Sequence, residues 1–274
     1  MLKRMLKRWA SYKYRFVPWL ALNLKDRQIR NVPKGSCDKV ITDEAAQQCM
    51  YKLFTAFETA KSRYSSNDPA IQYQTNMRVM KESLGFCIER AESVVKGGGT
   101  GVRVTDGTIP AFTVTSLYPG TVYHPYEPIF FQSISNPFVF RCIDRMLIDG
   151  NNKGLSKTVY KSCSNRDRIG PYMISDTSWL TKYPLNPMAV GQYVNNHTRA
   201  YAANVAYQEL DIDESFYFKL WKYLPNVCYG VNLDQPRQLR VVVLVSLRDI
   251  HKVPLLVDNK KAVTPFIRNS PNQT

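Results

Sequence analysis

The sequence predicts an α+β fold in which β-structure dominates and a helical segment precedes the sheets. Three observations support this fold class. Apolar residues recur at helical spacing between residues 41 and 95. From Gly97 onward, short β-rich pieces alternate with Gly, Pro and Asn, which is typical of strands joined by turns. Residues 239–247 form an almost entirely apolar run, as expected of a strand that is buried on both faces.

The first 40 residues form a basic, aromatic N-terminal segment. Nine of the 37 Lys and Arg residues fall within residues 1–30, where Asp26 is the single acid. A cation-rich start of this kind resembles a mitochondrial presequence. Its aromatic residues instead favour an ordered segment that packs on the body: Trp9, Tyr12, Tyr14, Phe16 and Trp19. Both interpretations fit, so an intracellular protein of the nucleus, the cytoplasm or the mitochondrion is expected.

Residues 41–95 are expected to form a helical hairpin that extends the main domain. Thr42 provides an N-cap, and Asp43 and Glu44 suit the positive end of the helix dipole. Apolar residues follow at helical spacing, namely Met50, Leu53, Phe54, Phe57 and Ala60. A second helix is expected after Pro69, with one face formed by Met77, Met80, Leu84, Cys87, Ile88 and Ala91. Both apolar stripes are interpreted as core-packing faces.

The main domain is expected to span residues 96–250, followed by a divergent C-terminal tail at 251–274. Its strands are predicted at residues 102–104, 112–117, 129–131, 138–143 and 239–247. The stretches near 145–190 and 208–238 are interpreted as irregular inserts.

Composition excludes several classes of protein. No apolar run approaches the roughly 18 residues of a membrane-spanning helix, so integral membrane contact is not expected. The six cysteines lie far apart without a C-x-x-C pair, so no metal site is expected, and free thiols in a reducing compartment are the simpler interpretation. The net charge of +15 favours an acidic partner. Nucleic acid contact fits but is not required, because the charges are scattered.

Three short motifs contain residues that need special surroundings. Residues 99–101 read Gly-Thr-Gly and residues 118–120 read Tyr-Pro-Gly, and each motif alone predicts no more than a turn. Asn195, Asn196 and Asn204 lie among apolar β-formers, although strands normally exclude asparagine. Because a buried Asn side chain must find hydrogen-bond partners, these three predict either a turn or contact with a polar ligand.

The order of these motifs resembles that of the SET-domain family. The G-x-G motif comes first, the Y-x-G motif follows about 17 residues later, and then come the asparagines and a strand that ends with Arg-Asp-Ile at residues 248–250. The resemblance runs from about residue 9 to residue 250. Further blocks carry it at residues 12–23, 118–123, 126–133, 147–151, 166–168 and 189–195.

This resemblance implies a β-clip fold with a pseudoknot, an S-adenosylmethionine pocket and the methylation of a lysine side chain on a protein substrate. The cofactor is then expected to contact Gly99, Thr100, Gly101, Val102, Asn195, Asn196 and Asn204. Tyr118 is expected to border the pocket or the substrate channel, and Tyr193 is a second candidate for a catalytic role.

The chain departs from the family pattern at several positions. Asn196 stands where the family has histidine, Ala203 stands where it has proline, and His197 is interpreted as an exposed loop residue. After residue 250 the expected glycine, paired acids, leucine and tyrosine are absent, and no tyrosine follows Tyr229. The aromatic candidates for the role of the missing tyrosine are Tyr193, Tyr201 and Tyr207, for which ordinary packing is the alternative.

Three functions are consistent with these observations. The ordered motifs favour an S-adenosylmethionine-dependent protein-lysine methyltransferase. The missing last tyrosine favours a non-catalytic SET-domain scaffold that binds protein partners. The basic N-terminal segment and the overall charge would also fit a nucleic-acid or organelle protein without methyl chemistry.

Overall fold

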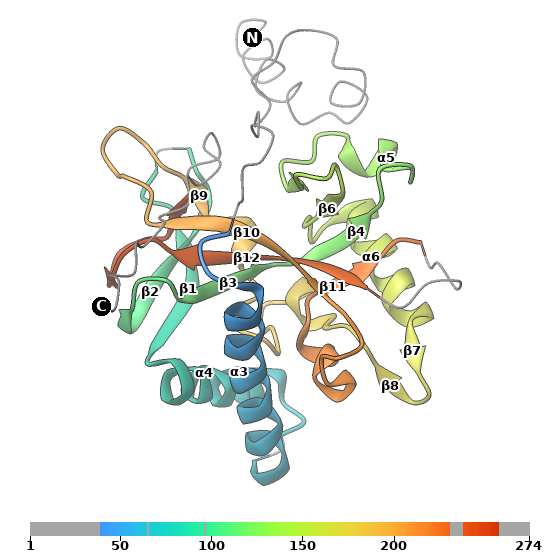
Figure 1. Cartoon of the computed structure of the whole chain (residues 1–274), viewed down its shortest axis with the longest axis horizontal. Helices are drawn as coiled ribbons and strands as arrows, with labels where there is room; N and C mark the ends of the chain where they lie inside the picture. The colour runs from blue at the N-terminus through green and yellow to red at the C-terminus, as the bar shows by residue number, and fades with distance from the viewer. Residues whose placement is uncertain (1–38, 65, 96, 231–237, 258–274) are drawn as a thin grey trace, which may run out of the picture.

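The computed structural model describes residues 39–64, 66–95, 97–230 and 238–257. The predictions for the N-terminal segment before residue 39 and for the tail after residue 257 lie outside these residues. Within them, two long helices lie against curled sheets, and shorter helices lie at the opposite end of the sheets (Figure 1). The predicted fold class, α+β and mainly β, is confirmed. The division of the chain into an extension, a main domain and a tail stays a prediction.

The first long helix, α3, spans Asp43–Arg63 as its sequence predicts. The Thr42 hydroxyl accepts a hydrogen bond from the backbone N–H of Ala45 at 3.2 Å, and Asp43 and Glu44 lie in the first turn. The predicted apolar face is buried: Met50, Leu53, Phe54, Phe57 and Ala60. This face joins the same hydrophobic core as the sheets, so the helix is held by tertiary packing.

The second helix, α4, is shorter than predicted. It spans Pro69–Leu84 and ends at Gly85, whose φ of 84° is a left-handed conformation that commonly terminates helices. Strand β1, Phe86–Glu92, follows immediately. The prediction that Cys87, Ile88 and Ala91 extend the helix face is therefore wrong, because a three-residue apolar spacing does not by itself separate a helix from a half-buried strand.

Three sheets form the β-structure around the site. One sheet contains β1, β2 (Thr100–Ile109) and β13 (Ile250–His251), in that order. The central sheet has the order β3 (Val114–Tyr118), β12 (Leu239–Ser246), β10 (Val205–Ile212), β14 (Leu256–Val257) and β9 (Asn195–Asn196). A third contains β11 (Asn226–Cys228), β4 (Gly120–Tyr123), β6 (Leu147–Asp149) and β5 (Val139–Arg141).

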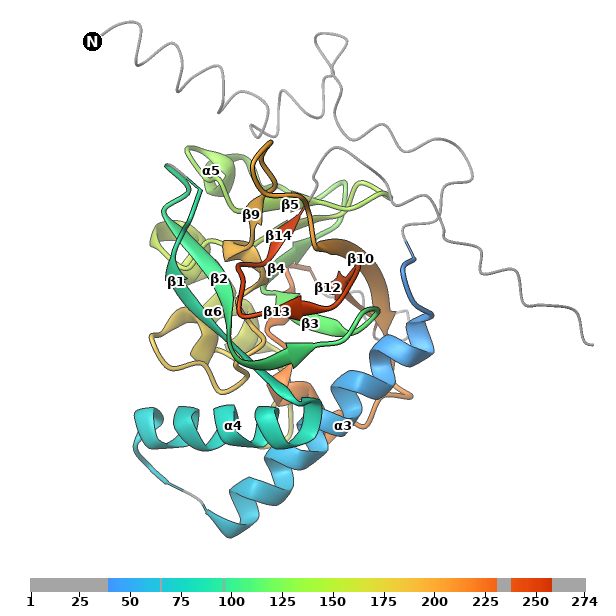
Figure 2. The same cartoon turned by 90° about the vertical axis from the view of Figure 1, so that its left-hand side faces the viewer.

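The last strand of the central sheet is threaded between two earlier ones. Strand β14 pairs in parallel with both β9 and β10, although β9 and β10 follow each other in the chain. The connection between those two strands, residues 197–204, therefore crosses β14. Figure 2 shows β14 beside β9 and β10. This arrangement agrees with the threaded topology that the family resemblance implied.

Several segments differ from the predicted secondary structure. Residues 130–133 form the short helix α5 (Phe130–Ser133) in place of a strand. The stretch near 145–190 contains helix α6 (Gly154–Arg166), and the stretch near 208–238 begins inside strand β10. Helix α6 buries Ser156, Tyr160, Cys163 and Ser164, so its inward face lacks the apolar periodicity that would have revealed it. The remaining elements are β7 (Arg168–Ile169), β8 (Tyr172–Met173), η1 (Ser178–Leu180), η2 (Gly191–Tyr193) and η3 (Phe218–Tyr223).

Asp176 gives the fold a predictable dependence on pH. Its buried carboxylate accepts hydrogen bonds from the Ser178 backbone and hydroxyl, at 2.7 and 2.5 Å. Burial raises the pKa of Asp176 to about 6, although these bonds and a backbone N–H of Asn186 act to lower it. The pKa of Asp176 in the folded chain lies above the ordinary 3.8, so protonated Asp176 contributes stability to the fold. This contribution is complete below pH 3.8 and is lost as the pH rises through about 6.

We expect the free energy of unfolding to lose roughly 3 kcal/mol between about pH 4 and 6 through Asp176, at 1.36 kcal/mol per pKa unit. Asp176→Asn should flatten this slope, because asparagine does not ionise. Urea unfolding at a series of pH values measures it, with the exposed Glu214→Gln as control. Equal slopes in the wild type and Asp176→Asn would contradict the assignment.

Candidate functional site

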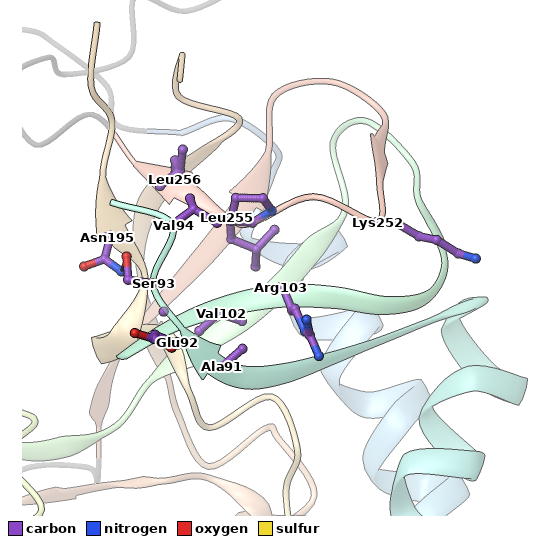
Figure 3. A pocket seen from close by; sticks show the side chains of 12 residues that line it. Ala91, Glu92, Ser93, Val94, Val102, Arg103, Asn195, Lys252, Leu255 and Leu256 are labelled. Atoms are coloured by element: carbon purple, nitrogen blue, oxygen red, sulfur yellow. Dashed lines mark hydrogen bonds between the residues drawn. The ribbon is translucent and has the colours of Figure 1, made fainter. Parts of the chain in front are cut away.

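Two predicted site segments that lie far apart in the sequence meet in the fold. The side-chain nitrogen of Asn195 donates to the backbone oxygen of Thr100 at 3.1 Å and to the hydroxyl of Ser93 at 2.9 Å. Asn195 belongs to β9, and Thr100 begins β2. The G-x-G loop and the first asparagine of the predicted site are therefore in direct contact. Figure 3 shows Asn195 beside Ser93, its second hydrogen-bond partner.

Gly101 allows this close contact. A Cβ atom at this position would lie 3.1 Å from the side-chain nitrogen of Asn195 and 3.3 Å from the Cα of Ser93. Both distances are tighter than ordinary carbon contacts, and the nearer atom belongs to a side chain held by two hydrogen bonds. The loop before Gly101 is closed by the backbone N–H of Ser93, which donates to the oxygen of Gly99 at 2.8 Å. A glycine at position 101 thus allows the loop between β1 and β2 to lie against β9.

A cleft of about 190 Å³ lies beside this contact. It is lined by residues 91–94 at the end of β1, residues 101–103 of β2, Asn195, and tail residues 252 and 254–256. Figure 3 shows Asn195 and Ser93 at one end and Lys252 at the other. The lining combines apolar Leu255 and Leu256 with the charged Glu92, Arg103 and Lys252. Because typical ligand sites measure about 300–1,000 Å³, a nucleoside-sized ligand would extend beyond this cleft.

The C-terminal tail forms one wall of the cleft. The backbone N–H of Leu255 donates to the oxygen of Val102 at 2.8 Å, and the N–H of Val104 donates to the oxygen of Val253 at 3.3 Å. Leu255 and Leu256 are buried. The sequence prediction missed these residues because the family's last motif is absent from the tail. The apolar run at residues 253–257, within an otherwise polar tail, is the signal that could have found them.

Asn204 holds the tail in place. Its side-chain nitrogen donates to the oxygen of Pro254 at 2.9 Å, and its side-chain oxygen accepts from the backbone N–H of Leu256 at 2.8 Å. The residue is only 3% exposed. Both the nitrogen and the oxygen of its side-chain amide are therefore hydrogen-bonded to the tail. Asn204 is not among the residues that line the cleft.

Asn196, the other predicted asparagine, is exposed and pairs with Val257 through β9 and β14. It does not line the cleft either. The neighbouring His197 is partly buried rather than exposed, and its backbone N–H donates to the oxygen of Val257 at 2.8 Å. Both residues therefore support the threaded strand through their backbone.

The two predicted catalytic tyrosines lie in an aromatic cluster outside the cleft lining. The Tyr118 hydroxyl donates to the oxygen of Phe138 at 2.8 Å, and the ring centroids of Tyr118 and Phe140 are 5.3 Å apart. Tyr193 packs edge-on against Phe138, with 5.8 Å between ring centroids. Tyr207 joins the cluster at 4.8 Å from Phe140. The structure thus brings Tyr118, Tyr193 and Tyr207 to one region.

Comparison with known proteins decides the family. No family model matches the sequence. The chain is 45% identical over 291 residues to SET domain-containing protein 9 of Homo sapiens, covering 94% of this chain and 97% of that protein. It is also 44% identical over 261 residues to SET domain-containing protein 9 of Pongo abelii, covering 84% of this chain and 95% of that one. The chain belongs to the SET domain-containing protein 9 family. The SET-domain resemblance of its motifs is therefore confirmed.

One acidic cluster in this SET-domain protein has the residue types of a metal site. Cys142, Asp144 and Glu209 offer ligand atoms within 4.8 Å of one another. The Arg240 guanidinium already lies 2.9 Å from Asp144 and 3.1 Å from Glu209. Burial raises the pKa of the Cys142 thiol well above its ordinary value, which disfavours the thiolate that a metal needs. The cluster is therefore interpreted as an ion-pair network around Arg240.

Two other sequence expectations for this family member concern its thiols and the membrane. The cysteines within the described ranges, Cys49, Cys87, Cys142, Cys163 and Cys228, are free thiols. In the part of the chain that the structure covers, no helix combines the length and the apolar character needed to span a bilayer.

Proposed function

We propose that this chain binds S-adenosylmethionine at the cleft beside Gly101 and Asn195, and that it transfers the methyl group to a lysine side chain of a protein substrate. The observation that carries the proposal is the hydrogen bond from Asn195 to Thr100, because it joins the two segments that SET domains use for the cofactor. The relatives named for a SET domain support the same chemistry.

The residues around the cleft fit such a cofactor. The methionine part of S-adenosylmethionine carries an ammonium and a carboxylate, and the cleft provides the carboxylate of Glu92 and the cations of Arg103 and Lys252. Backbone groups near Gly101 and Val102 are close to the cleft because glycine has no side chain there. Leu255 and Leu256 supply apolar surface on the opposite wall.

The chemistry sets requirements on the substrate side. When bound, S-adenosylmethionine would supply a methyl group on a sulfonium. Attack by an amine lone pair would form the N–C bond as the C–S bond broke and left its electron pair on sulfur. The lysine amine must therefore be neutral, which costs roughly 4–5 kcal/mol at neutral pH because a lysine side chain in water has a pKa of ~10.4. A dry aromatic environment offsets this cost because desolvation disfavours the ammonium. The cluster of Tyr118, Phe140 and Tyr207 offers such an environment.

Calorimetric titration with S-adenosylhomocysteine, the product of transfer, tests the cofactor proposal. We expect a dissociation constant in the micromolar range and a competing effect of S-adenosylmethionine on the same site. Binding no tighter than millimolar would contradict it.

A second candidate function is a non-catalytic scaffold that keeps the cofactor cleft. The observation in its favour is that no tyrosine follows Tyr229, whereas SET enzymes place their last tyrosine beside the methyl group. Transfer of a radioactive methyl group to protein separates the two candidates. Transfer that exceeds that of a cleft-blocked variant favours the enzyme, and cofactor binding without transfer favours the scaffold. Contact with nucleic acid stays a prediction from charge alone.

A further inference from the structure

Two arginines at the end of strand β5 form a pair of like charges, called the arginine pair below. Arg141 ends β5, and Arg145 lies in the turn that leads to β6. In the part of the chain that the structure describes, neither guanidinium forms a hydrogen bond or an ion pair. Arg141 is half-buried, and burial and, second, the charge of Arg145 lower the pKa of Arg141. A half-buried cation beside a like charge is unfavourable in the chain alone, and a bound anion would relieve it.

The acidic side chains around this turn are engaged with other partners. Asp144 lies 2.9 Å from the guanidinium of Arg240, and Glu209 lies 3.1 Å from the same group. Asp149, further along β6, is buried and accepts a hydrogen bond from the side-chain nitrogen of Asn136 at 2.7 Å. Among the described residues, the acids near the turn therefore leave the arginine pair uncompensated.

The backbone fixes the arginine pair at one edge of a sheet. Strand β5 is the last strand of its four-stranded sheet. Across the turn, the N–H of Cys142 donates to the oxygen of Met146 at 2.8 Å, and the N–H of Arg145 donates to the oxygen of Cys142 at 3.1 Å. Arg145 has a φ of 73°, a left-handed conformation that residues other than glycine rarely adopt. Because such a conformation persists only where the surrounding structure fixes it, the turn holds Arg145 near Arg141.

An exposed apolar surface adjoins the face of the sheet that carries Arg141. Side chains alternate along a strand and directly opposite residues share a face, so Arg141 lies on the same face as Val139 and Leu147. Both apolar residues pack with Ile129, which precedes α5. Figure 2 shows α5 and β5 at the same end of the molecule. On α5, the side chain of Phe131 is 70% exposed. Other exposed apolar residues of this region are Tyr126, Phe130 and Ile134.

We propose that the arginine pair binds a carboxylate of a protein partner, and that apolar residues beside this carboxylate pack on the exposed surface of α5. A carboxylate suits arginine because the guanidinium offers two parallel N–H donors. Arginine next to exposed aromatic side chains is also typical of protein interfaces. A polyanion such as nucleic acid or an anionic membrane fits less well, because the exposed Asp144 adjoins Arg145 and repels further negative groups.

The test titrates the full chain with two short peptides at about 0.15 M salt. One peptide has two adjacent glutamates flanked by leucines, and the other has glutamines in their place. Arginine side-chain Nε–Hε resonances locate the contact, because the basic N-terminal segment also attracts acids. We expect the glutamate peptide to shift the resonances of the arginine pair and the glutamine peptide to leave them unchanged. Absence of a shift with the glutamate peptide would overturn the proposal.

Arg141→Gln and Arg145→Asn remove one cation each, and asparagine tolerates the left-handed conformation at position 145. We expect each variant to bind the glutamate peptide roughly tenfold more weakly, measured at the resonance of the remaining arginine. The Tm of both should stay at or above that of the wild type, because neither guanidinium has a partner among the described residues. Arg78→Gln, at an exposed position of α4, is the matched control and should change neither quantity.

Phe131→Ser tests the apolar part of the surface. We expect it to weaken the glutamate peptide several-fold while the shifts of the arginine pair keep their direction. Tyr64 offers the matched control, because its ring is 68% exposed at the end of α3, away from α5. Tyr64→Ser should therefore bind the peptide as the wild type does. Equal affinities of the two serine variants would show that the exposed surface of α5 takes no part.

Two further outcomes would overturn the inference. A fall in the Tm of Arg141→Gln below that of Arg78→Gln would mean that the guanidinium has a structural role. Single-stranded RNA and vesicles that contain phosphatidylserine offer phosphate in place of carboxylate, and binding of either through the arginine pair without binding of the peptide would exclude a protein partner. None of these measurements uses the cofactor, so their failure would leave the proposed function intact.

Discussion

Gly101→Leu is expected to weaken the binding of S-adenosylhomocysteine by roughly 1,000-fold, or about 4 kcal/mol. Even the first added carbon would lie 3.1 Å from the Asn195 side chain and 3.3 Å from the Cα of Ser93. The longer leucine side chain has to displace Asn195 or enter the adjoining cleft, which Gly101 lines. Either result separates the two loops or fills the space proposed for the cofactor.

Isothermal titration calorimetry measures this loss, and the melting temperature reports whether the variant remains folded. Gly154→Leu is the matched control: Gly154 opens helix α6, and a Cβ atom there meets nothing within 4 Å. Its φ of 55° means that leucine should lower stability by about 1 kcal/mol without changing cofactor affinity. If Gly101→Leu bound the cofactor as tightly as Gly154→Leu, the cleft would not be the cofactor site.

Asn204→Leu is expected to lower the free energy of unfolding by roughly 2–5 kcal/mol. The substitution leaves the oxygen of the half-buried Pro254 and the N–H of the buried Leu256 without their partner. Each unsatisfied buried group costs about 1–3 kcal/mol. Because the tail forms one wall of the cleft, cofactor affinity should fall together with stability.

Denaturant unfolding measures the free energy of unfolding. Calorimetric titration at a temperature where the variant is folded measures its affinity for the cofactor. Asn67→Leu, at an exposed position before helix α4, is the control and should stay within about 0.5 kcal/mol of the wild type. Asn204→Asp keeps the acceptor for the N–H of Leu256 but places a negative oxygen against the oxygen of Pro254. Its loss of unfolding free energy should therefore exceed that of Asn67→Leu and reach or pass the middle of the range expected for Asn204→Leu. A stability equal to that of Asn67→Leu would show that the amide does not hold the tail.

Local patterns predicted those elements whose burial follows a simple period. Helix α3 has its cap, its early acids and its apolar stripe in the sequence, and strand β12 is apolar on both faces because seven of its eight residues are buried. The helix prediction for Cys87 and Ile88 was wrong because their spacing fits both a helix and a strand. Only Gly85 marks the boundary between α4 and β1. Helix α6 failed because it buries hydroxyls and a thiol rather than an apolar stripe.

The candidate site was predictable where backbone motifs decide it. The glycine loop and Asn195 were both predicted as cofactor contacts, and the structure brings the two together, while their contact with a cofactor stays a prediction. The direction of a side chain depends on tertiary neighbours, so the sequence did not reveal that Asn204 faces the tail.

The threading of β14 has a consequence for how this protein is made. Strands β9 and β10 leave the ribosome well before Leu256 and Val257, yet their edges face each other only through that late segment. A nascent chain can therefore form the helices and the neighbouring sheets before β14 takes its place between β9 and β10. The central sheet can therefore close only after residues 256–257 have been made, and the cleft lacks the wall formed by Leu255 and Leu256 until then.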